Sequence, residues 1–406
     1  MCALTFHKTG ENPVKPLGRA PAEDQIIGGH GFLGIQPPES LAVVLDNGSG
    51  YVKGGVANDW EPKIVSPQVV GRPRFRSIIL ERESVFVGNH ARARSGICTL
   101  KSPSVRGTVV NFDDQGLIWY DLIKRDLGVD TEDTPVLLGQ PPIGLSRCHQ
   151  EKIAEMFFDE FSVSSLCLKA DSVLSLYGLG LSTGLVLDCG DAVSYSSAVY
   201  NGDIVSNSVE TLELGGKDVT DYMVKLMIGD SGFYARSKSE IDQIRLIKEA
   251  FGGVTDPGPR QVDQKAENDF ELPDGQKVHV SANAGTAGDL LFDPGLDGMD
   301  SKGVAEMLNA SAKHCNKSIH GFLFEHVVLS GGSTLLSRFK NRVHHDLANL
   351  SGACLPENSV VQGTSPQFGV WRGGMVVANL STFEQLSVSR DEYLECGPRI
   401  IGYKCL

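Results

Sequence analysis

The most informative part of this chain is residues 43–53, which read Val43-Val44-Leu45-Asp46-Asn47-Gly48-Ser49-Gly50-Tyr51-Val52-Lys53. The continuous apolar run Val43-Val44-Leu45 is typical of a strand buried on both faces. The turn that follows carries little side chain, so its backbone N–H groups can approach one anion closely. Lys53 can then neutralise phosphate charge. The spacing GxxxxGK[ST] is absent, which excludes a P-loop.

Two later apolar runs enter turns of the same kind, at residues 188–191 (DCGD) and 330–333 (SGGS). Asp46 and Asp188 each follow a strand directly, so we expect both carboxylates to face one cleft. Such a pair suits Mg²⁺ or Ca²⁺ held through water beside phosphates. Each turn alone could be an ordinary strand exit with Asp and Gly in turn positions. The set, together with Lys53, favours phosphate binding.

The rest of the chain alternates strand and helix patterns, which predicts an α/β fold with sheets covered on both faces. Its 406 residues exceed what one hydrophobic core usually holds, so we expect at least two domains. Further buried strands are predicted at residues 136–138, 185–187 and 327–329. Two helix faces are predicted from apolar spacing, the first made of Ile153, Met156, Phe157 and Phe161, and the second of Leu336, Phe339, Val343 and Leu347.

The formal net charge of −13 disfavours non-specific binding to nucleic acid or anionic membrane. The nine cysteines lack the paired spacing of a zinc site, so we expect reduced thiols in a cytosolic or nuclear compartment. No apolar run approaches the roughly 20 residues that span a bilayer. Residues 1–40, rich in Gly, Pro and charge, are predicted to form a flexible extension. Its Gly29–Gly34 match to GxGxxG is weak, and a loop is expected there.

Residues 45–53 closely resemble the first phosphate loop of actin, and further segments resemble actin in the same order along the chain. The resemblance runs from about residue 41 to the C-terminus. These segments are Val70-Gly71-Arg72-Pro73-Arg74, Thr99-Leu100-Lys101, Pro135-Val136-Leu137-Leu138, Val173-Leu174-Ser175-Leu176-Tyr177, Asp188-Cys189-Gly190-Asp191, Glu271-Leu272-Pro273-Asp274-Gly275, Val328-Leu329-Ser330-Gly331-Gly332, Leu380-Ser381-Thr382-Phe383 and Lys404-Cys405-Leu406.

The resemblance implies the actin-like ATPase fold shared by actin, Hsp70 and sugar kinases, with two lobes of two subdomains each around a nucleotide cleft. After the extension at 1–40, it implies subdomain 1 at 41–67, 103–178 and 369–406, subdomain 2 at 68–102, subdomain 3 at 179–214 and 299–368, and subdomain 4 at 215–298. The implied ligands are ATP or ADP with Mg²⁺ or Ca²⁺.

The resemblance also implies roles for individual residues. Asp46 and Asp188 would hold the cation through water. The first phosphate loop would be Gly48, Ser49, Gly50, Tyr51 and Lys53, and the second Asp191, Ala192 and Val193. Around the adenosine it implies Gly216, Arg245, Lys248, Glu249, Gly331, Gly332, Ser333 and Leu335. A solvated helix face is the alternative interpretation of Arg245, Lys248 and Glu249.

Several positions depart from actin. Asp171 and Tyr195 stand where actin has a Gln and a supporting His near the attacking water. A carboxylate can accept a proton, bind the cation, or slow turnover by adding negative charge beside the phosphates. Asp171, Tyr195 and Asp188 are therefore the catalytic candidates, Asp171 is a further candidate metal ligand, and hydrolysis is expected to be slow or altered. Leu336 and Gln367 replace an aromatic residue and a Lys on the adenine side.

Surface positions also differ. The segment Phe75 to Val85 is shorter and more charged than the flexible outer loop of actin. Asp297 occupies an apolar position in the loop that plugs between filament strands, where an unpaired carboxylate is costly. Arg106 replaces a His. The partner groove would be lined by Tyr177, Gly180, Ser182, Val376, Leu380 and Leu386, with Arg372 in place of an aliphatic residue.

These features predict a divergent actin-like protein that acts as a structural subunit of a cytoskeletal assembly or specialised filament in the cytoplasm. Other actin-fold subunits or actin-binding proteins would be its partners, and weak ATP hydrolysis its activity if it is an enzyme. One alternative is a nuclear actin-related subunit of a chromatin-remodelling complex. Others are a sugar-kinase-like enzyme with Asp171 as base, and a protein whose cleft stays empty.

Overall fold

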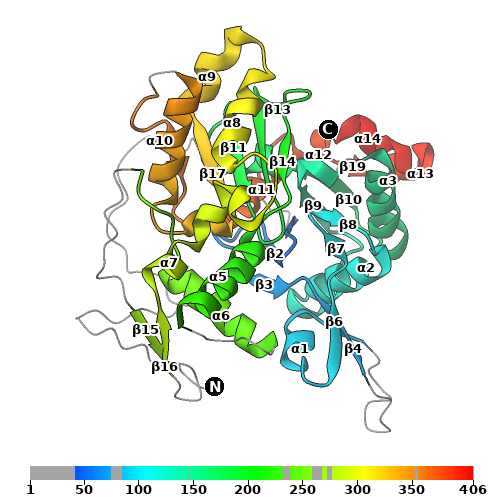
Figure 1. Cartoon of the computed structure of the whole chain (residues 1–406). Helices are drawn as coiled ribbons and strands as arrows, with labels where there is room; N and C mark the ends of the chain where they lie inside the picture. The colour runs from blue at the N-terminus through cyan, green and yellow to red at the C-terminus, as the bar shows by residue number, and fades with distance from the viewer. Residues whose placement is uncertain are drawn as a thin grey trace.

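The computed structural model describes residues 42–74, 85–144, 146–231, 238–257, 268–271, 277–352 and 355–405. The predictions made for residues 1–40, including the motif at 29–34, and for the outer segment at 75–84 lie outside the described residues, as do residues 272–276 and Leu406. Within the described part, all four predicted strands form, and two large sheets dominate the fold (Figure 1).

The first large sheet has the strand order β19-β10-β9-β1-β2-β3. Its strand β1 is parallel to β9 and antiparallel to β2. Val43 and Leu45 share a core with Trp119, whereas Val44 shares a core with Trp371 on the other face, as expected for a strand buried on both sides. The strands are β1 (Val43–Asn47), β2 (Tyr51–Val56), β3 (Ile64–Pro67), β9 (Pro135–Gln140), β10 (Ser165–Ala170) and β19 (Val388–Ser389).

The second large sheet has the order β13-β12-β11-β17-β18, with β14 paired to β12. It repeats the pattern of the first sheet, because β11 is antiparallel to β12 and parallel to β17. Asp46 pairs with Lys53 in the first hairpin, and Asp188 pairs with Tyr195 in the second. The strands are β11 (Gly184–Cys189), β12 (Ser194–Tyr200), β13 (Asp203–Ile204), β14 (Glu210–Leu212), β17 (Val327–Ser330) and β18 (Val360–Gln362).

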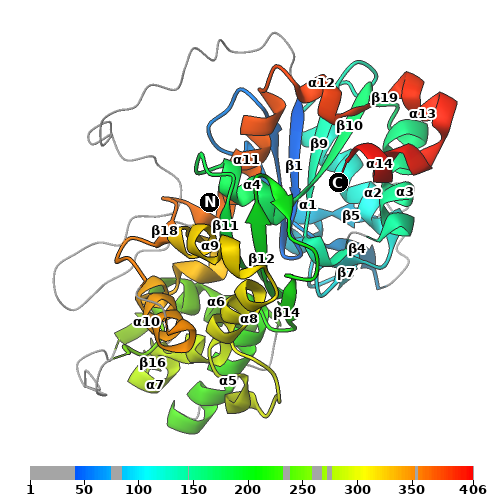
Figure 2. The ribbon, with the colours of Figure 1, turned by 90° about the horizontal axis from the view of Figure 1, so that it is seen from above.

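Two helices lie between the large sheets, α4 (Asp171–Tyr177) and α11 (Gly369–Ala378). They pack closely against each other, and α4 also contacts β11 and β17 (Figure 2). We call the part built on the first sheet the first lobe and the part built on the second sheet the second lobe. The outer face of the first sheet carries α2 (Phe112–Tyr120) and α3 (Arg147–Glu155), and the second carries α8 (Val304–Lys313) and α9 (His320–Glu325).

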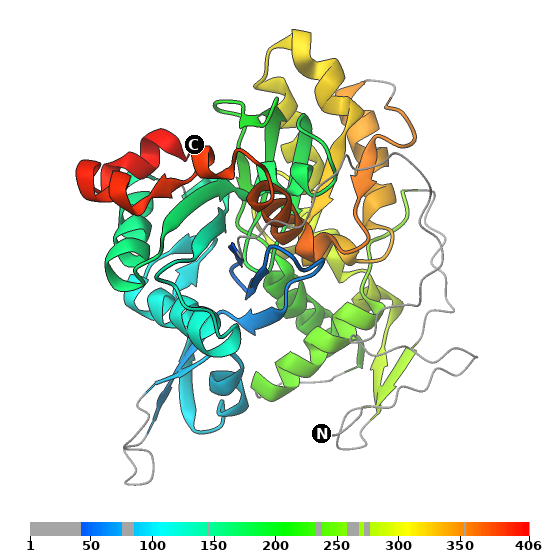
Figure 3. The same cartoon turned by 180° about the vertical axis from the view of Figure 1, so that it is seen from behind.

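Smaller elements extend each lobe on the same side of the molecule (Figures 1 and 3). The boundaries given above for the four subdomains remain predictions. The first lobe adds β4 (Val70–Pro73), β5 (Phe86–Val87), α1 (Gly88–Ala93), β6 (Cys98–Lys101) and the hairpin of β7 (Ser104–Val105) and β8 (Thr108–Val109). The second adds α5 (Gly216–Ser231), α6 (Lys238–Phe251), β15 (Asn268–Glu271), β16 (Lys277–Val280) and α7 (Ala282–Gly285).

The structure confirms that the residues of the first predicted helix face are buried, and it corrects the second face at one residue. In the first, all four apolar residues are buried, although α3 ends at Glu155 and continues as a π-helix over Met156–Glu160. In the second, α10 (Phe339–Ser351) buries Phe339, Val343 and Leu347. The prediction that Leu336 belongs to this helix is wrong, because Arg338 adopts a left-handed backbone (φ 67°) that starts α10 after it. Leu336 instead lines a cavity.

The first lobe ends with α12 (Phe383–Leu386), α13 (Arg390–Cys396) and α14 (Ile401–Lys404). The last of these packs beside α3 at the outer edge of the lobe (Figure 2). None of the described helices combines the length and the apolar character needed to cross a bilayer.

Candidate functional site

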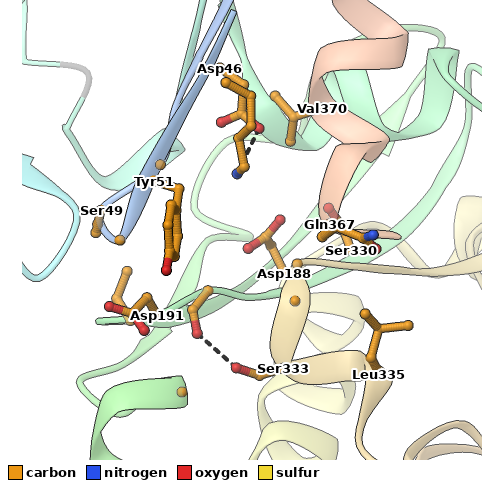
Figure 4. A pocket seen from close by; sticks show the side chains of 18 of the residues that line it. Asp46, Ser49, Tyr51, Asp188, Asp191, Ser330, Ser333, Leu335, Gln367 and Val370 are labelled. Carbon is orange, nitrogen blue, oxygen red and sulfur yellow. Dashed lines mark hydrogen bonds and ion pairs between the residues drawn. The ribbon is translucent and has the colours of Figure 1, made fainter. Parts of the chain in front are cut away.

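A cavity of about 610 Å³ lies where the strand ends of both large sheets meet. This volume is in the usual range for small-molecule sites, roughly 300–1,000 Å³. The predicted site residue Ala192 is not part of the lining. All the other predicted site residues line the cavity, namely Asp46, Gly48, Ser49, Gly50, Tyr51, Lys53, Asp171, Asp188, Asp191, Val193, Tyr195, Gly216, Arg245, Lys248, Glu249, Gly331, Gly332, Ser333 and Leu335 (Figure 4).

The turns at the ends of β1 and β11 approach each other closely. A Cβ placed on Gly50 would lie 2.6 Å from the Cβ of Asp191, so a larger residue at this point would push the two turns apart. Gly331 has a φ of +88°, and a Cβ there would lie 2.4 Å from the carbonyl oxygen of Cys189. Both glycines therefore allow a close approach of the turns that a side chain would prevent.

The first of these turns is held from behind by buried polar side chains. Asn47 Oδ1 accepts hydrogen bonds from Gln115 Nε2 at 3.0 Å and from Trp119 Nε1 at 3.2 Å. The backbone N–H of Gln68 donates to the carbonyl of Gly50 at 3.0 Å. These supporting residues were missed from the sequence, because they are scattered over some 70 positions and carry no local motif.

Three buried carboxylates and one ammonium group form what we call the charged end of the cavity: Asp46, Asp171, Asp188 and Lys53. Lys53 Nζ lies 3.0 Å from Asp46 Oδ2. Burial disfavours the charged form of Lys53, but Asp46 and the other carboxylates outweigh it, so the pKa of Lys53 is raised. Burial raises the pKa of Asp188 to about 6. One cation among three carboxylates leaves the charged end with surplus negative charge.

Among these four groups, Asp171 has a buried oxygen atom that lacks a hydrogen-bond partner in the described part of the chain. This atom is Oδ1, and the residue as a whole is 6% exposed. Burial and then the charges of Asp46 and Asp188 raise its pKa well above the ordinary value. Asp46 and Asp188 point into the same cavity (Figure 4). A divalent cation would compensate this charge and give the orphaned oxygen a partner, so the residues fit such an ion.

Tyr195 is 3% exposed, and its neighbouring hydroxyl partly offsets the rise in the pKa of Asp171. Burial, followed by the repulsion of Asp188 and Asp171, raises the pKa of its hydroxyl well above the ordinary value. The phenol therefore stays neutral and cannot remove a proton from water. Of this pair, Asp171 is left as the group that could accept a proton from water.

The opposite end of the cavity, which we call the apolar end, contains Leu335, Leu336 and Gln367. Leu335 is 54% exposed at the rim, whereas Leu336 is buried. Gln367 Oε1 is buried without a hydrogen-bond partner in the described part of the chain. A Cβ on Gly332 would have a single neighbour at 4.0 Å, so space is left beside it. This end can accept a flat, largely apolar group but offers it no charge.

Helix α6 forms a side wall between the two ends. Lys248 Nζ donates to the carbonyl of Gly216 at 2.5 Å and is 7% exposed, so its side chain does not belong to a solvated helix face. Burial lowers the pKa of this amine. Arg245 donates to Glu249 at 2.9 Å and stacks over the ring of Tyr51 with its guanidinium carbon 4.9 Å from the centroid. The wall thus joins the second lobe to the first turn.

The family model for actin ("Actin") matches residues 38–406. The chain belongs to the actin family. It is also 33% identical over 376 residues to "Putative actin-29" of Dictyostelium discoideum, an alignment that covers 90% of this chain and 97% of the relative. Actin-family proteins generally bind ATP or ADP with a divalent cation.

Arg106, known from the sequence only as a departure from actin, links the two lobes of this actin-family chain. It lies at the tip of the β7–β8 hairpin in the first lobe. Its guanidinium donates to the Ala192 carbonyl at 2.7 Å and to both carboxylate oxygens of Asp218 at 2.6 and 2.9 Å. Ala192 therefore contributes its backbone rather than its side chain. Because such a bidentate pair is directional, Arg106 fixes the second turn relative to the first lobe.

A second bridge crosses between the lobes at the mouth of the cleft. Arg92 on α1 donates to the hydroxyl of Tyr51 at 2.9 Å and to Asp242 on α6 at 3.0 Å. Both side chains of the Arg92–Asp242 pair are about one-third exposed or more, so solvent weakens the ion pair. The two arginines are exposed to a similar extent, and the bridges differ mainly in their carboxylates, because Asp218 is 18% exposed and Asp242 is 42% exposed.

The charged substitutions on the surface have partners within the chain. Asp297, which the resemblance to actin predicts to lie in the plug loop, accepts hydrogen bonds from Lys225 at 2.6 and 2.9 Å. Arg372, in the predicted groove, donates to Glu61 and to Thr364, each at 3.2 Å. These carboxylate and guanidinium groups are therefore compensated locally, although neither pair is fully buried.

Proposed function

We propose that this chain binds ATP or ADP with Mg²⁺ or Ca²⁺ in the cleft and acts as a structural actin-family subunit that hydrolyses ATP slowly. The observation that carries the proposal is the charged end, where Asp171 joins Asp46 and Asp188 around Lys53. Asp171 is buried, and its Oδ1 has no hydrogen-bond partner among the described residues. A bound cation would neutralise the carboxylates and the phosphates together. Asp46 and Asp188 would hold its water ligands, with Asp171 as a further ligand.

The remaining binding roles follow from the walls of the cavity. Ser49, Gly50 and Tyr51 would present backbone N–H groups to the phosphates, with Lys53 as counter-charge, and Asp191 and Val193 would close the site from the second lobe. Gly332 and Leu335 would border the base, whereas Lys248, Arg245 and Glu249 on α6 would border the ribose. The glycine contacts at the turns support this arrangement, because they leave the backbone uncovered.

Slow hydrolysis is supported by the environment of Asp171. An amide could orient water without adding charge, but Asp171 places a carboxylate beside two others and beside the expected phosphates. Tyr195 remains neutral and cannot take over as a base. If Asp171 binds the cation, it is also unavailable to the water. Each route lowers the rate, although proton acceptance by Asp171 could partly offset the loss.

Exchange of Asp171 for Gln tests this proposal. We expect phosphate release from Mg-ATP to become faster while ATP affinity changes little, because the substitution restores a neutral water-orienting group. Nucleotide affinity is measured by calorimetry, and phosphate release is measured in single-turnover assays. Equal hydrolysis rates in the two proteins would remove Asp171 from the mechanism. Absence of ATP binding to the wild-type chain would overturn the proposal as a whole.

The structural role is tested by sedimentation of the pure protein with Mg-ATP. Pelleting above a critical concentration would support a filament-forming subunit in the cytoskeleton. A protein that binds ATP but stays in the supernatant would indicate a subunit of a larger complex, and localisation of the tagged chain would then separate cytoplasmic from nuclear assemblies. The groove at Tyr177, Gly180, Arg372, Val376 and Leu380 is the proposed partner surface. Sugar-stimulated ATP consumption would instead favour the kinase-like alternative.

A further inference from the structure

The side chain of Tyr51 lies between two cavities at the mouth of the cleft. Three residues, Tyr51, Arg245 and Glu249, line both the cavity of about 610 Å³ described above and an outer cavity of about 360 Å³. The outer cavity is completed by Arg92, Asp242, Gln243 and Leu246. Because the side chains of Arg92 and Asp242 are partly exposed, the outer cavity opens to solvent. The three shared residues therefore separate the inner cavity from solvent at this point.

The Tyr51 side chain contacts one arginine from each lobe. Arg92, on α1 of the first lobe, donates to its hydroxyl at 2.9 Å. Arg245, on α6 of the second lobe, lies over its ring with the guanidinium carbon 4.9 Å from the centroid. Arg92 also uses its other terminal nitrogen to reach Asp242 across the mouth at 3.0 Å. Tyr51 thus orients Arg92 toward Asp242 and supports Arg245 directly, and we call these two interactions between the lobes the mouth contacts.

The backbone of Tyr51 belongs to the first turn. Tyr51 follows Gly50 directly and is the first residue of β2. A Cβ on Gly48 would lie 2.8 Å from the carbonyl oxygen of Tyr51, and a Cβ on Gly50 would lie 2.6 Å from the Cβ of Asp191. The turn is therefore packed tightly on both sides of this residue. An anion that draws the N–H groups of the turn toward itself must move the Tyr51 ring as well.

We propose that Tyr51 is a positioning residue that slows the release of nucleoside di- and triphosphates. Its backbone N–H binds the phosphates, and its side chain keeps both mouth contacts in place while they are bound. This inference rests on the proposed function, because it takes phosphate as the ligand of the first turn. The hydroxyl acts through Arg92, whereas the ring acts on Arg245, so the two parts of the side chain make separable contributions.

Two substitutions of Tyr51 test these contributions in the full chain with Mg²⁺. Tyr51→Phe removes only the hydroxyl, and we expect release of a fluorescent ATP analogue in stopped flow to be about five-fold faster. Tyr51→Leu also removes the ring, and release should be about twenty-fold faster. The association rate should change by less than about two-fold in both variants, because the mouth contacts form after the nucleotide enters.

Tyr403→Phe is the matched control. Tyr403 also lies beneath an arginine, since the guanidinium carbon of Arg147 is 5.9 Å from its ring centroid. Both residues belong to the first lobe, and Tyr403 is 73% exposed. Its exchange should leave nucleotide release unchanged. Equal acceleration by Tyr51→Phe and Tyr403→Phe, or no acceleration by Tyr51→Phe, would overturn the inference and leave ATP binding itself intact.

Combination of Tyr51→Phe with Asp242→Asn separates a positioning role from a general loss of stability. Because the hydroxyl acts through Arg92 on Asp242, the double variant should release nucleotide about as fast as the faster single variant. Multiplication of the two single effects would contradict the inference.

Backbone hydrogen exchange measures the mouth contacts without nucleotide. Exchange in α1 and α6 should be faster in Tyr51→Phe than in the wild type, and equal exchange would also contradict the inference. A wild-type chain that binds no ATP analogue would instead overturn the proposed function.

Discussion

The charged and apolar ends of the cleft lie in one cavity, but their side chains differ in charge and in burial. At the charged end, Asp46, Asp171 and Asp188 are between 3% and 8% exposed and surround one lysine. At the apolar end, Leu335 is 54% exposed. The three residues that define this end, Leu335, Leu336 and Gln367, carry no charge. The charged end should therefore respond strongly to single substitutions, and the apolar end weakly.

Exchange of Lys53 for Met, at the charged end, should have the largest effect on stability and on ATP binding. Removal of the ammonium leaves three buried carboxylates without a counter-charge, a loss that typically costs about 3–5 kcal/mol. We expect the free energy of unfolding without ligand to fall by about that amount and ATP binding to be lost. Urea unfolding and calorimetry measure the two effects. Lys340→Met on the exposed face of α10 is the matched control, and equal losses in both variants would contradict the special role of Lys53.

Asp171→Asn should act in the opposite direction on stability. It removes one of the three like charges and keeps the shape of the side chain. The free energy of unfolding without cation should rise by about 1–3 kcal/mol, the usual cost of a buried polar group without a partner. Added Mg²⁺ should then stabilise the variant less than the wild type, because a carboxylate has gone. Urea unfolding with and without Mg²⁺ tests this, and a less stable variant would show that Asp171 is already satisfied.

Arg106→Lys would show how far the charged end depends on the fixed position of the second turn. Lysine keeps the charge but loses the two-pronged contact with Asp218. Because the guanidinium is partly exposed, we expect a modest effect of about 1 kcal/mol, seen as nucleotide release that is about five-fold faster. Release is followed with a fluorescent ATP analogue in stopped flow.

Arg125→Lys is the control for this experiment. Arg125 also pairs with an aspartate, but Asp121 lies four residues away in the same helical segment of the first lobe. Its replacement should leave nucleotide release unchanged. If both substitutions accelerate release equally, the effect is a general loss of stability and not the connection between the lobes.

Leu335→Ala should have the smallest effect. More than half of the side chain is already in solvent, so its truncation removes little buried apolar area from the complex. We expect ATP affinity to fall by less than about five-fold, which corresponds to about 1 kcal/mol. Leu394→Ala, exposed on α13 away from the cleft, should leave affinity unchanged. A loss above tenfold for Leu335→Ala would mean that the apolar end orders around the base.

The sequence alone was sufficient to predict the strand-and-turn framework of this protein. Continuous apolar runs followed by Asp or Ser and Gly correctly predicted β1, β11 and β17. The repeat of the two hairpins was also visible, because each pattern is short and local. The resemblance to actin was sufficient for the family and the fold, since its motifs follow in order along most of the chain.

The tertiary structure alone decided the contacts between distant segments. The support of Asn47 by Gln115 and Trp119 and the link from Arg106 to Asp218 join residues separated by 68 to 112 positions. It also decided that Leu336 leaves the helix and lines the cleft. Local patterns determine strands and turns because these depend on neighbouring residues, whereas partners of buried polar groups are determined only when the two lobes pack together.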